Sequence, residues 1–264
     1  MLALRGGTPL RDVAADPWPT WPIWDKNDHH RLEQVLDSGI WSYSGPAEQE
    51  CLSWLEKYFS NSRVVLVANG TVSLQIALEA LDIGYGDEVI VPGLTWQATA
   101  AAVLDVNAVP VLVDIDPETW CLDPAACEDA ITDRTKAIIP VHLYGCTTDM
   151  DAIMDIAKRH NLAVIEDASH KHGAEWNGQK LGTIGEIGSF SLQLSKVLTC
   201  GEGGILLARE NSTWERLEAL RNCGRRSLNA FSDATGGRYG EEGNFLQSGN
   251  YRITDFQAAV LLSQ

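Results

Sequence analysis

The chain has 264 residues, 45% of them hydrophobic and 21% charged, a composition that predicts a soluble globular protein with one large, well-filled core. Its formal net charge of −16 comes from dispersed acidic residues and argues against a nucleic-acid partner, which would require a basic face. No apolar stretch approaches the length of a membrane span, and residues 1–9 lack the apolar run of a signal peptide, so no membrane partner is expected.

The cysteines are widely spaced, and no two of them form a CxxC pair. Their pattern therefore indicates neither a structural zinc site nor a disulfide scaffold. Scattered cysteines in a chain of this size fit a reducing compartment, so we expect a cytoplasmic protein without bound metal. The six positions are Cys51, Cys121, Cys127, Cys146, Cys200 and Cys223.

Residues 1–25 are predicted to form an extended N-terminal arm, because prolines alternate with tryptophans in the stretch WPTWPIW at 18–24. Three tryptophans need an apolar surface, and both a neighbouring subunit and the chain's own body could provide it. Two helices are expected after the arm, over residues 28–38 and 47–58.

Residues 26–250 then read as one large domain in which strands alternate with helices. This alternation predicts a three-layer α/β/α fold with a mainly parallel sheet. Near its end, two strands over 189–192 and 204–208 have no helix between them, which indicates an antiparallel addition to the sheet. The earlier strands are expected at 64–68, 88–91, 109–114, 136–143 and 163–166, and the helices at 72–81, 95–106, 124–131, 149–160 and 212–222.

Residues 251–264 begin a further segment. The stretch TDFQAAVLLSQ at 254–264 has the pattern of the first turns of an amphipathic helix, with no stop signal or cap. We therefore expect a truncated C-terminal segment, with a small C-terminal domain missing.

The stretch GSFSLQLSKVLTCGEGG at 188–204 holds the most informative residue, Lys196. Its small, apolar or neutral neighbours would disfavour the ammonium form, and such an amine can attack a carbonyl carbon to form a Schiff base. The glycine-rich end at 201–204 suits a tight turn. From these residues alone, an ordinary surface lysine in a loop remains the alternative.

Several polar residues fall at the predicted carboxyl ends of strands, where open α/β sheets bind ligands. Gly70 and Thr71 begin a helix, whose free backbone N–H groups attract phosphate. Asp167 ends an apolar strand and would need a cationic partner. Ser191 lies five residues before Lys196. A purely structural role is the alternative for these residues. Gly-Thr is a common helix start, and an aspartate at a strand end is often only a cap.

Four ordered motifs together resemble the fold-type I pyridoxal-phosphate enzymes and, among them, the sugar aminotransferase family named DegT/DnrJ/EryC1/StrS. The resemblance extends over nearly the whole chain. It implies the large domain of that fold and pyridoxal 5'-phosphate as cofactor. The motifs are NGT at 69–71, IEDASHKHGA at 165–174, GSFSLQLSKVLTCGEGG at 188–204 and GNYRITDFQAA at 249–259.

The resemblance also implies roles for the catalytic residues. Lys196 would form the Schiff base with the cofactor and carry the proton during transfer. Asp167 would pair with the pyridine nitrogen, so that the ring withdraws electrons. His170 would hydrogen-bond the phenolic oxygen of the ring, and Trp96 would stack on its face.

The phosphate would be held from two subunits according to the same resemblance. Gly70, Thr71 and Ser191 would bind it within the chain, and Asn250 would reach the phosphate of the other subunit. Each site would then need a homodimer. The amino donor's carboxylate is not assigned, and the candidates are Arg225, Arg226 and Arg252 because guanidinium groups suit carboxylates.

One departure from the sugar-type pattern narrows the expected reaction. Gln193 stands where many sugar-specific members have histidine, and this residue, with WPTWP at 18–22, resembles the branch acting on scyllo-inosose and 2-deoxy-scyllo-inosose. We therefore expect amino transfer from glutamine or glutamate to a keto-cyclitol or keto-sugar in aminocyclitol antibiotic biosynthesis. The alternatives are an enzyme like 3-amino-5-hydroxybenzoate synthase and a non-catalytic fragment that binds pyridoxal phosphate.

Overall fold

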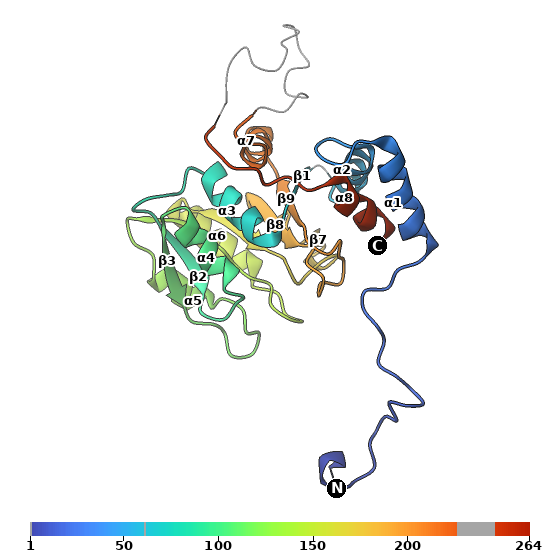
Figure 1. Ribbon diagram of the computed structural model, residues 1–264. Coiled ribbons are helices and arrows are strands. Elements are labelled where there is room, and N and C mark those ends of the chain that lie inside the picture. Colours follow the sequence, from blue (N-terminus) through green and yellow to red (C-terminus); the bar gives the residue numbers. More distant parts are fainter. Residues whose placement is uncertain (1, 61, 226–245) are drawn as a thin grey trace, which may run out of the picture.

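A seven-stranded sheet runs through the centre of the molecule (Figure 1). The computed structural model describes residues 2–60, 62–225 and 246–264. Strand β9 is antiparallel to both of its neighbours, and the other adjacent pairs are parallel, so the predicted mainly parallel sheet is confirmed. The strand order is β1 (Arg63–Val67), β9 (Gly204–Ala208), β8 (Ile187–Ser191), β5 (Ala163–Asp167), β4 (Thr135–Ile138), β2 (Glu88–Pro92) and β3 (Val109–Val113).

Helices cover both faces of this sheet, which gives the expected three layers. Alternate residues of a strand point to opposite faces, so Val65 belongs to one apolar cluster and Leu66 to the other. The Val65 cluster includes α3 (Gly70–Ala80), α4 (Ala98–Asp105) and α7 (Asn211–Arg221). The Leu66 cluster includes α2 (Pro46–Tyr58), α5 (Pro124–Asp129), α6 (Met150–His160) and α8 (Asp255–Ser263).

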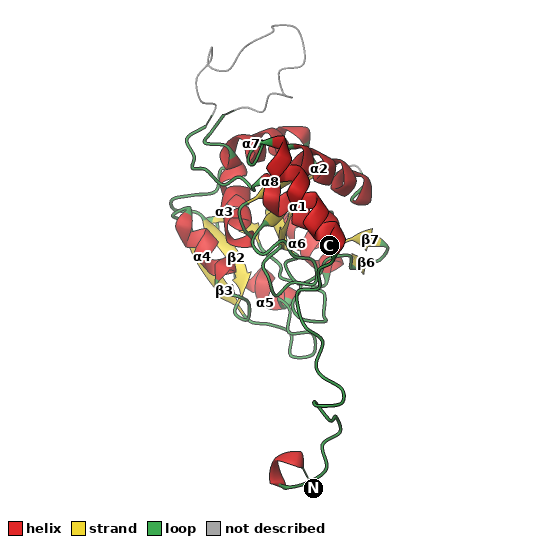
Figure 2. Ribbon diagram, turned by 45° about the vertical axis from the view of Figure 1, so that its right-hand side comes forward, coloured by secondary structure: helices red, strands yellow, loops and turns green. Residues whose placement is uncertain are grey.

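Helix α8 packs against both α1 (Lys26–Ser38) and α2, and the three helices lie together in Figure 1 and Figure 2. Its start is fixed by a capping box, in which Thr254 and Gln257 exchange side-chain and backbone hydrogen bonds, so the expectation of a helix without a cap was wrong. Asp255 also accepts the backbone N–H of Glu48 at 2.8 Å, which joins α8 to the first turn of α2. The predicted helix over 254–264 is therefore confirmed, and it belongs to the same body as the sheet.

Two details differ from the predicted elements. Strand β4 ends at Ile138 instead of continuing to residue 143, because Pro140 has no N–H to donate to the ladder. An additional hairpin joins β6 (Glu175–Trp176) to β7 (Gln179–Lys180). Its turn, Asn177-Gly178, has φ angles of +48° and +81°, as expected for an Asn-Gly turn of this kind.

The antiparallel position of β9 determines where residues 192–203 lie. Ser191 at the end of β8 pairs with Gly204 at the start of β9. A parallel neighbour would require a crossover to the opposite end of the sheet, whereas this connection returns directly. The segment that carries Lys196 therefore stays at the carboxyl end of β8, beside the ends of the parallel strands.

The two edges of the sheet end differently. At the β1 edge, Ala68 donates to the carbonyl of Tyr251 at 2.8 Å, and Val67 bridges Arg252, so a returning segment covers the strand end. At the β3 edge, Val109 donates inward to Asp87 at 2.8 Å. Because successive N–H groups alternate in direction, the backbone nitrogen of Pro110 points outward, and it has no hydrogen to donate.

Residues 2–25 lead away from the body of the molecule, as Figure 1 shows, and include one short turn, η1 (Ala3–Arg5). Trp18, Trp21 and Trp24 are exposed on it. The indole of Trp21 donates to the carbonyl of Leu194 at 2.5 Å, so the arm touches the segment that carries Lys196. No helix in the described part of the chain is long and apolar enough to cross a bilayer.

A buried ionic cluster joins α7 to α2. Arg221 donates to Glu48 at 2.6 Å and to Glu218 at 3.0 Å, and all three side chains are buried. Burial raises the pKa of Glu218, and the nearby Arg221 opposes that effect. The cluster therefore depends on its charges remaining paired.

Candidate active site

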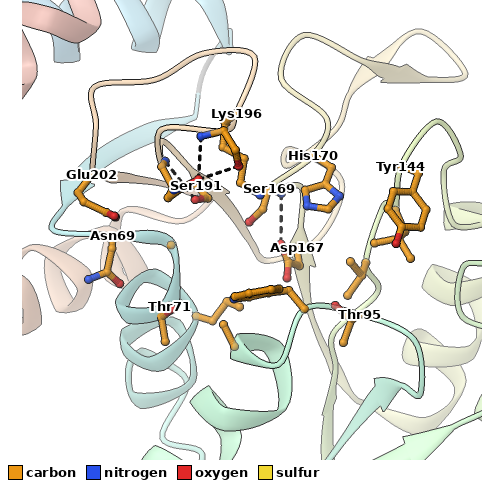
Figure 3. A pocket seen from close by; sticks show the side chains of 18 of the residues that line it. Asn69, Thr71, Thr95, Tyr144, Asp167, Ser169, His170, Ser191, Lys196 and Glu202 are labelled. Carbon is orange, nitrogen blue, oxygen red and sulfur yellow. Dashed lines mark hydrogen bonds between the residues drawn. The ribbon is translucent and has the colours of Figure 1, made fainter. Parts of the chain in front are cut away.

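A cavity of about 520 Å³ opens at the carboxyl ends of the strands (Figure 3). It is bordered by the segments that follow β1, β2, β4, β5 and β8, which is where an open α/β sheet binds its ligands. Seven of the eight residues expected at the cofactor site line it, namely Gly70, Thr71, Trp96, Asp167, His170, Ser191 and Lys196.

One end of the cavity is the N-terminus of α3. Asn69 caps the helix by accepting the N–H of Val72 at 2.9 Å, and the first helical bond runs from Ser73 to the carbonyl of Asn69. The amides of Gly70 and Thr71 precede that bond, so the helix presents donors and the positive end of its dipole to the cavity. This end of the cavity suits a phosphate group.

Gly70 is required there by its contact with β8. A Cβ atom added at Gly70 would lie 2.8 Å from the Cβ of Ser191. The hydroxyls of Ser73 and Ser189, 2.5 Å apart, join the same helix and strand one turn deeper. The close approach brings the Ser191 hydroxyl to the helix N-terminus.

Asp167 lies at the floor of the cavity and is only 5% exposed. Its carboxylate accepts hydrogen bonds from the hydroxyl of Thr99 at 3.0 Å and from the backbone N–H of Ser169 at 3.2 Å. These two donors fix the orientation of the side chain. A buried carboxylate held in this way can pair with a cationic ring nitrogen.

Lys196 faces the same cavity from the connection between β8 and β9 (Figure 3). Burial lowers the pKa of its amine, and the Asp167 charge acts in the opposite direction. The turn before Lys196 is held by Gln193, whose side-chain oxygen accepts from the N–H of Ser195 at 2.8 Å and from its hydroxyl at 2.7 Å. A larger fraction of neutral amine makes Lys196 a better nucleophile.

His170 lines the cavity, whereas His172, two residues later, packs against Phe190 and does not line it. Burial, with the Lys196 charge, lowers the pKa of His170, so its imidazole is neutral near pH 7 and can donate or accept a hydrogen bond. Burial lowers the pKa of His172 to about 4, and its ring packs 5.5 Å from that of Phe190.

Asn250 and the described arginines that were considered for the donor's carboxylate lie outside the cavity. Asn250 is exposed and bridges Asn222, outside the cavity. Arg252 donates to Asn222 at 2.7 Å, and Arg225 is exposed beyond the end of α7. Arg226 lies outside the described residues. Among the described residues, Asn250, Arg252 and Arg225 therefore do not line the cavity of the same chain.

Thr99 and Tyr144 are among the residues of the site that sequence reasoning missed. Thr99 lies one helical turn after Thr95, and its hydroxyl reaches Asp167 from the start of α4. A search for polar residues one turn after Trp96 would have found it. Tyr144 lines the cavity after β4, at a strand end of the kind that indicated Asp167.

Comparison with known proteins agrees with this site. Residues 22–264 match the profile of the DegT/DnrJ/EryC1/StrS aminotransferase family. The chain belongs to that family. Its resemblance to the family, expected from the four sequence motifs, is thereby confirmed.

Two relatives in this family are each 46% identical to the chain. Each alignment is 269 positions long and covers the whole chain. The two relatives are the L-glutamine:2-deoxy-scyllo-inosose aminotransferase of Streptoalloteichus tenebrarius and the L-glutamine:scyllo-inosose aminotransferase of Streptomyces griseus. The chain spans 62% of the length of each relative.

Solved structures of the family share the fold. A 3-amino-5-hydroxybenzoic acid synthase superposes with a TM-score of 0.85 at 34% identity, over 93% of this chain and 62% of the synthase. NtdA from Bacillus subtilis, whose structure holds the cofactor PMP, superposes with a TM-score of 0.78 at 32% identity, over 90% of this chain and 52% of NtdA.

Proposed function

We propose that this chain forms the cofactor-binding part of a pyridoxal 5'-phosphate-dependent aminotransferase. The observation that carries the proposal is the cavity in which an amine of lowered pKa, a buried carboxylate and a helix N-terminus lie together. The two cyclitol aminotransferases and the PMP-bound NtdA support the same assignment.

The residues present fit the proposed cofactor at three points. The amides of Gly70 and Thr71, with the Ser191 hydroxyl, would bind its phosphate. The Asp167 carboxylate, fixed by Thr99, would pair with the ring nitrogen. Lys196 would attach the cofactor through its amine.

When bound, pyridoxal phosphate supplies an electron-withdrawing ring that accepts and returns the amino group. Lys196 would hold and move a proton at its Nζ atom within each half-reaction, and burial favours the neutral amine that this task requires. Asp167 would stabilise positive charge at the ring nitrogen. Neutral His170 would orient the ring through one hydrogen bond.

The proposed donor is glutamine or glutamate, with glutamine preferred, and the proposed acceptor is a keto-cyclitol, with a keto-sugar as the wider class. Support comes from the names of the two relatives, which include L-glutamine and scyllo-inosose compounds. Neutral hydrogen-bonding groups line the cavity, including Thr95, Ser195 and Gln193, and these suit an amide and ring hydroxyls.

Two measurements test the proposal. Borohydride reduction of the protein with pyridoxal phosphate, followed by peptide mapping, should leave the pyridoxyl label on Lys196. Label on Lys171, which lies near the same cavity, would overturn the assignment. A screen of scyllo-inosose compounds and nucleotide-linked keto-sugars, each with glutamine and glutamate, should show preferred transfer from glutamine to the cyclitol.

A second candidate reaction is the one named for the synthase of 3-amino-5-hydroxybenzoic acid, because that structure superposes at a TM-score of 0.85. Its identity of 34% is lower than the 46% shared with the cyclitol aminotransferases. Formation of an aromatic product from a cyclic ketone, without amino transfer to the cyclitol, would favour it.

We further propose that the protein is a cytoplasmic homodimer with shared sites. All six cysteines are free thiols, as expected in a reducing compartment. Asn250 is exposed outside its own cavity, where it could reach the cavity of a second copy, and the arm presents three exposed tryptophans that a second copy could cover.

A further inference from the structure

Two exposed aromatic side chains stand at the outer end of the cavity. Tyr144, which is 62% exposed, lines it, and Trp120, which is 51% exposed, lies next to Tyr144 with the ring centroids 5.9 Å apart in a T-shaped contact. Tyr144 in turn lies 6.2 Å from His170. Figure 3 shows Tyr144 beyond His170 on the side away from Lys196. The three rings form a continuous row leading out of the site.

Two loops present these rings from the ends of β3 and β4, the two strands that flank β2 in the sheet. One follows β3 and carries Trp120, and the other follows β4 and carries Tyr144. The loops are joined beneath the rings by a small apolar cluster in which Cys121, Val141 and Leu143 are buried. The neighbours of each aromatic residue are therefore anchored, whereas the aromatic rings themselves remain exposed.

Both aromatic residues have a backbone conformation that bulky side chains rarely adopt. The φ angle is +62° at Trp120 and +48° at Tyr144. Trp120 closes a tight loop, in which its N–H donates to Asp116 at 2.8 Å and the N–H of Asp116 donates to Cys121 at 2.9 Å. Glycine or asparagine would fit that position with less strain. Strain that persists at the mouth of a cavity indicates a functional constraint on the side chain.

We propose that Trp120 and Tyr144 form a stacking platform for the ring of the amino acceptor, a cyclic polyol. The acceptor class rests on the proposed function. A polyol ring whose hydroxyls are all equatorial has only axial C–H bonds on its faces, and these bear the partial positive charge that the negative face of an aromatic ring attracts. Its hydroxyl edges remain free for the neutral groups of the cavity, such as Thr95 and Ser195.

The row of rings also explains how a small acceptor is held outside the cofactor site. His170 belongs to the cofactor wall, so a ring stacked on Tyr144 would lie next to the reacting end of the cavity. Trp120 extends the apolar surface outward and would shield one side of the bound ring from water. The platform would therefore set the KM for the acceptor and would not affect the KM for the amino donor.

The variant Trp120→Asn tests this platform without a loss of folding. Asparagine suits a positive φ, so the melting temperature should equal or exceed that of the wild type. The acceptor KM should rise about tenfold, because one aromatic contact is lost, while the donor half-reaction, followed by the cofactor absorption band, should not change. Trp120→Phe should retain most acceptor affinity.

The matched control is Trp54→Leu, since Trp54 is 57% exposed on α2, away from the cavity. This variant should leave the acceptor KM unchanged. An unchanged acceptor KM in Trp120→Asn would overturn the platform. Equal changes in the donor and acceptor half-reactions would also overturn it. A weakened oligomer with normal acceptor binding would overturn it too, because that result would show that a second copy covers Trp120.

A binding measurement separates this inference from the proposed reaction. Saturation-transfer NMR on the protein loaded with pyridoxal phosphate should show transfer from aromatic protons to scyllo-inositol, whose hydroxyls are all equatorial. The signal should be weaker for D-chiro-inositol, which has an axial hydroxyl on each face, and should be lost in Trp120→Asn. Binding with this pattern but no amino transfer would refute the proposed reaction and retain the platform, whereas equal signals from both inositols would refute the platform.

Discussion

Asp167 shows how a single side chain combines burial with fixed orientation. Hydrogen bonds from Thr99 and from the backbone of Ser169 hold its carboxylate at the floor of the cavity. The negative charge therefore faces the cavity in a fixed position. Preorganised charge of this kind is worth more in a dry site than in water.

We expect Asp167→Asn to retain most of the cofactor and to lose turnover by about 10²-fold or more, because a neutral amide does not stabilise a positive ring nitrogen. Cofactor content by absorbance and amino transfer by product analysis would check this. Asp105→Asn, a change on the exposed side of α4, serves as the control and should leave both unchanged. Wild-type turnover in Asp167→Asn would contradict the role.

His172 makes the stability of the protein depend on pH. Its folded-state pKa of about 4 lies below its ordinary value of 6.5. The unfolded chain therefore binds more protons between these values, and stability is lost as the pH falls from 6.5 toward 4. The full difference between the two pKa values corresponds to about 3 kcal/mol of unfolding free energy.

We expect His172→Phe to flatten the dependence of the unfolding free energy on pH between 6.5 and 4, because phenylalanine keeps a buried ring without a titrating group. Urea unfolding at several pH values measures it. His30→Phe, at an exposed position on α1, should keep the wild-type slope. An identical slope in both variants would show that His172 is not the source.

Ser191 was identified by its position five residues before Lys196, whereas the strand-end rule identified Asp167, which ends an apolar run, and Gly70, which begins a helix just after one. That rule could not predict Thr99, since that hydroxyl reaches Asp167 only through the way α4 packs on the sheet. The backbone strain at Trp120 was also hidden, because φ is set by a loop closed through Asp116.

At the scale of elements, periodicity predicted every long helix and strand but not where β4 ends. Its apolar run continues past Ile138, and the ladder is interrupted only because Pro140 lacks a donor. The β6–β7 hairpin had a sequence signal in Asn177-Gly178, but its strands of two residues each are too short for a periodic pattern.

The connection between α2 and α7 depends on the buried charges around Arg221. We expect Arg221→Met to lower the unfolding free energy by about 3–5 kcal/mol, because Glu48 and Glu218 would remain buried without their cation. The measurement is urea unfolding at neutral pH. In the double variant with Glu218→Gln, the loss should be smaller than the sum of the two single losses.

Arg31→Met provides the comparison, since Arg31 joins α1 to α2 through Glu50 at 3.2 Å in a partly exposed pair. Its loss should cost less than about 1 kcal/mol. Similar losses for Arg31→Met and Arg221→Met would show that burial does not govern the contribution of these ion pairs.

At the scale of the whole molecule, the exposed arm and the outlying Asn250 predict self-association. Sedimentation equilibrium should give twice the chain mass of 28.9 kDa. Deleting residues 2–20 should weaken the dimer, because it removes Trp18 from the proposed interface but keeps the contact of Trp21 with Leu194. A monomer that binds pyridoxal phosphate as tightly as the wild type would contradict the shared site.

The two sheet edges have a consequence for the behaviour of the protein at high concentration. Unprotected edge strands recruit strands from other molecules and initiate aggregation. Here the segment through Tyr251 covers the carboxyl end of β1, and Pro110 removes an outward donor from β3. Neither edge therefore offers a complete row of unpaired backbone groups to a strand of another molecule. Specific assembly through side chains can then proceed without competition from the strand-to-strand addition that leads to insoluble fibres.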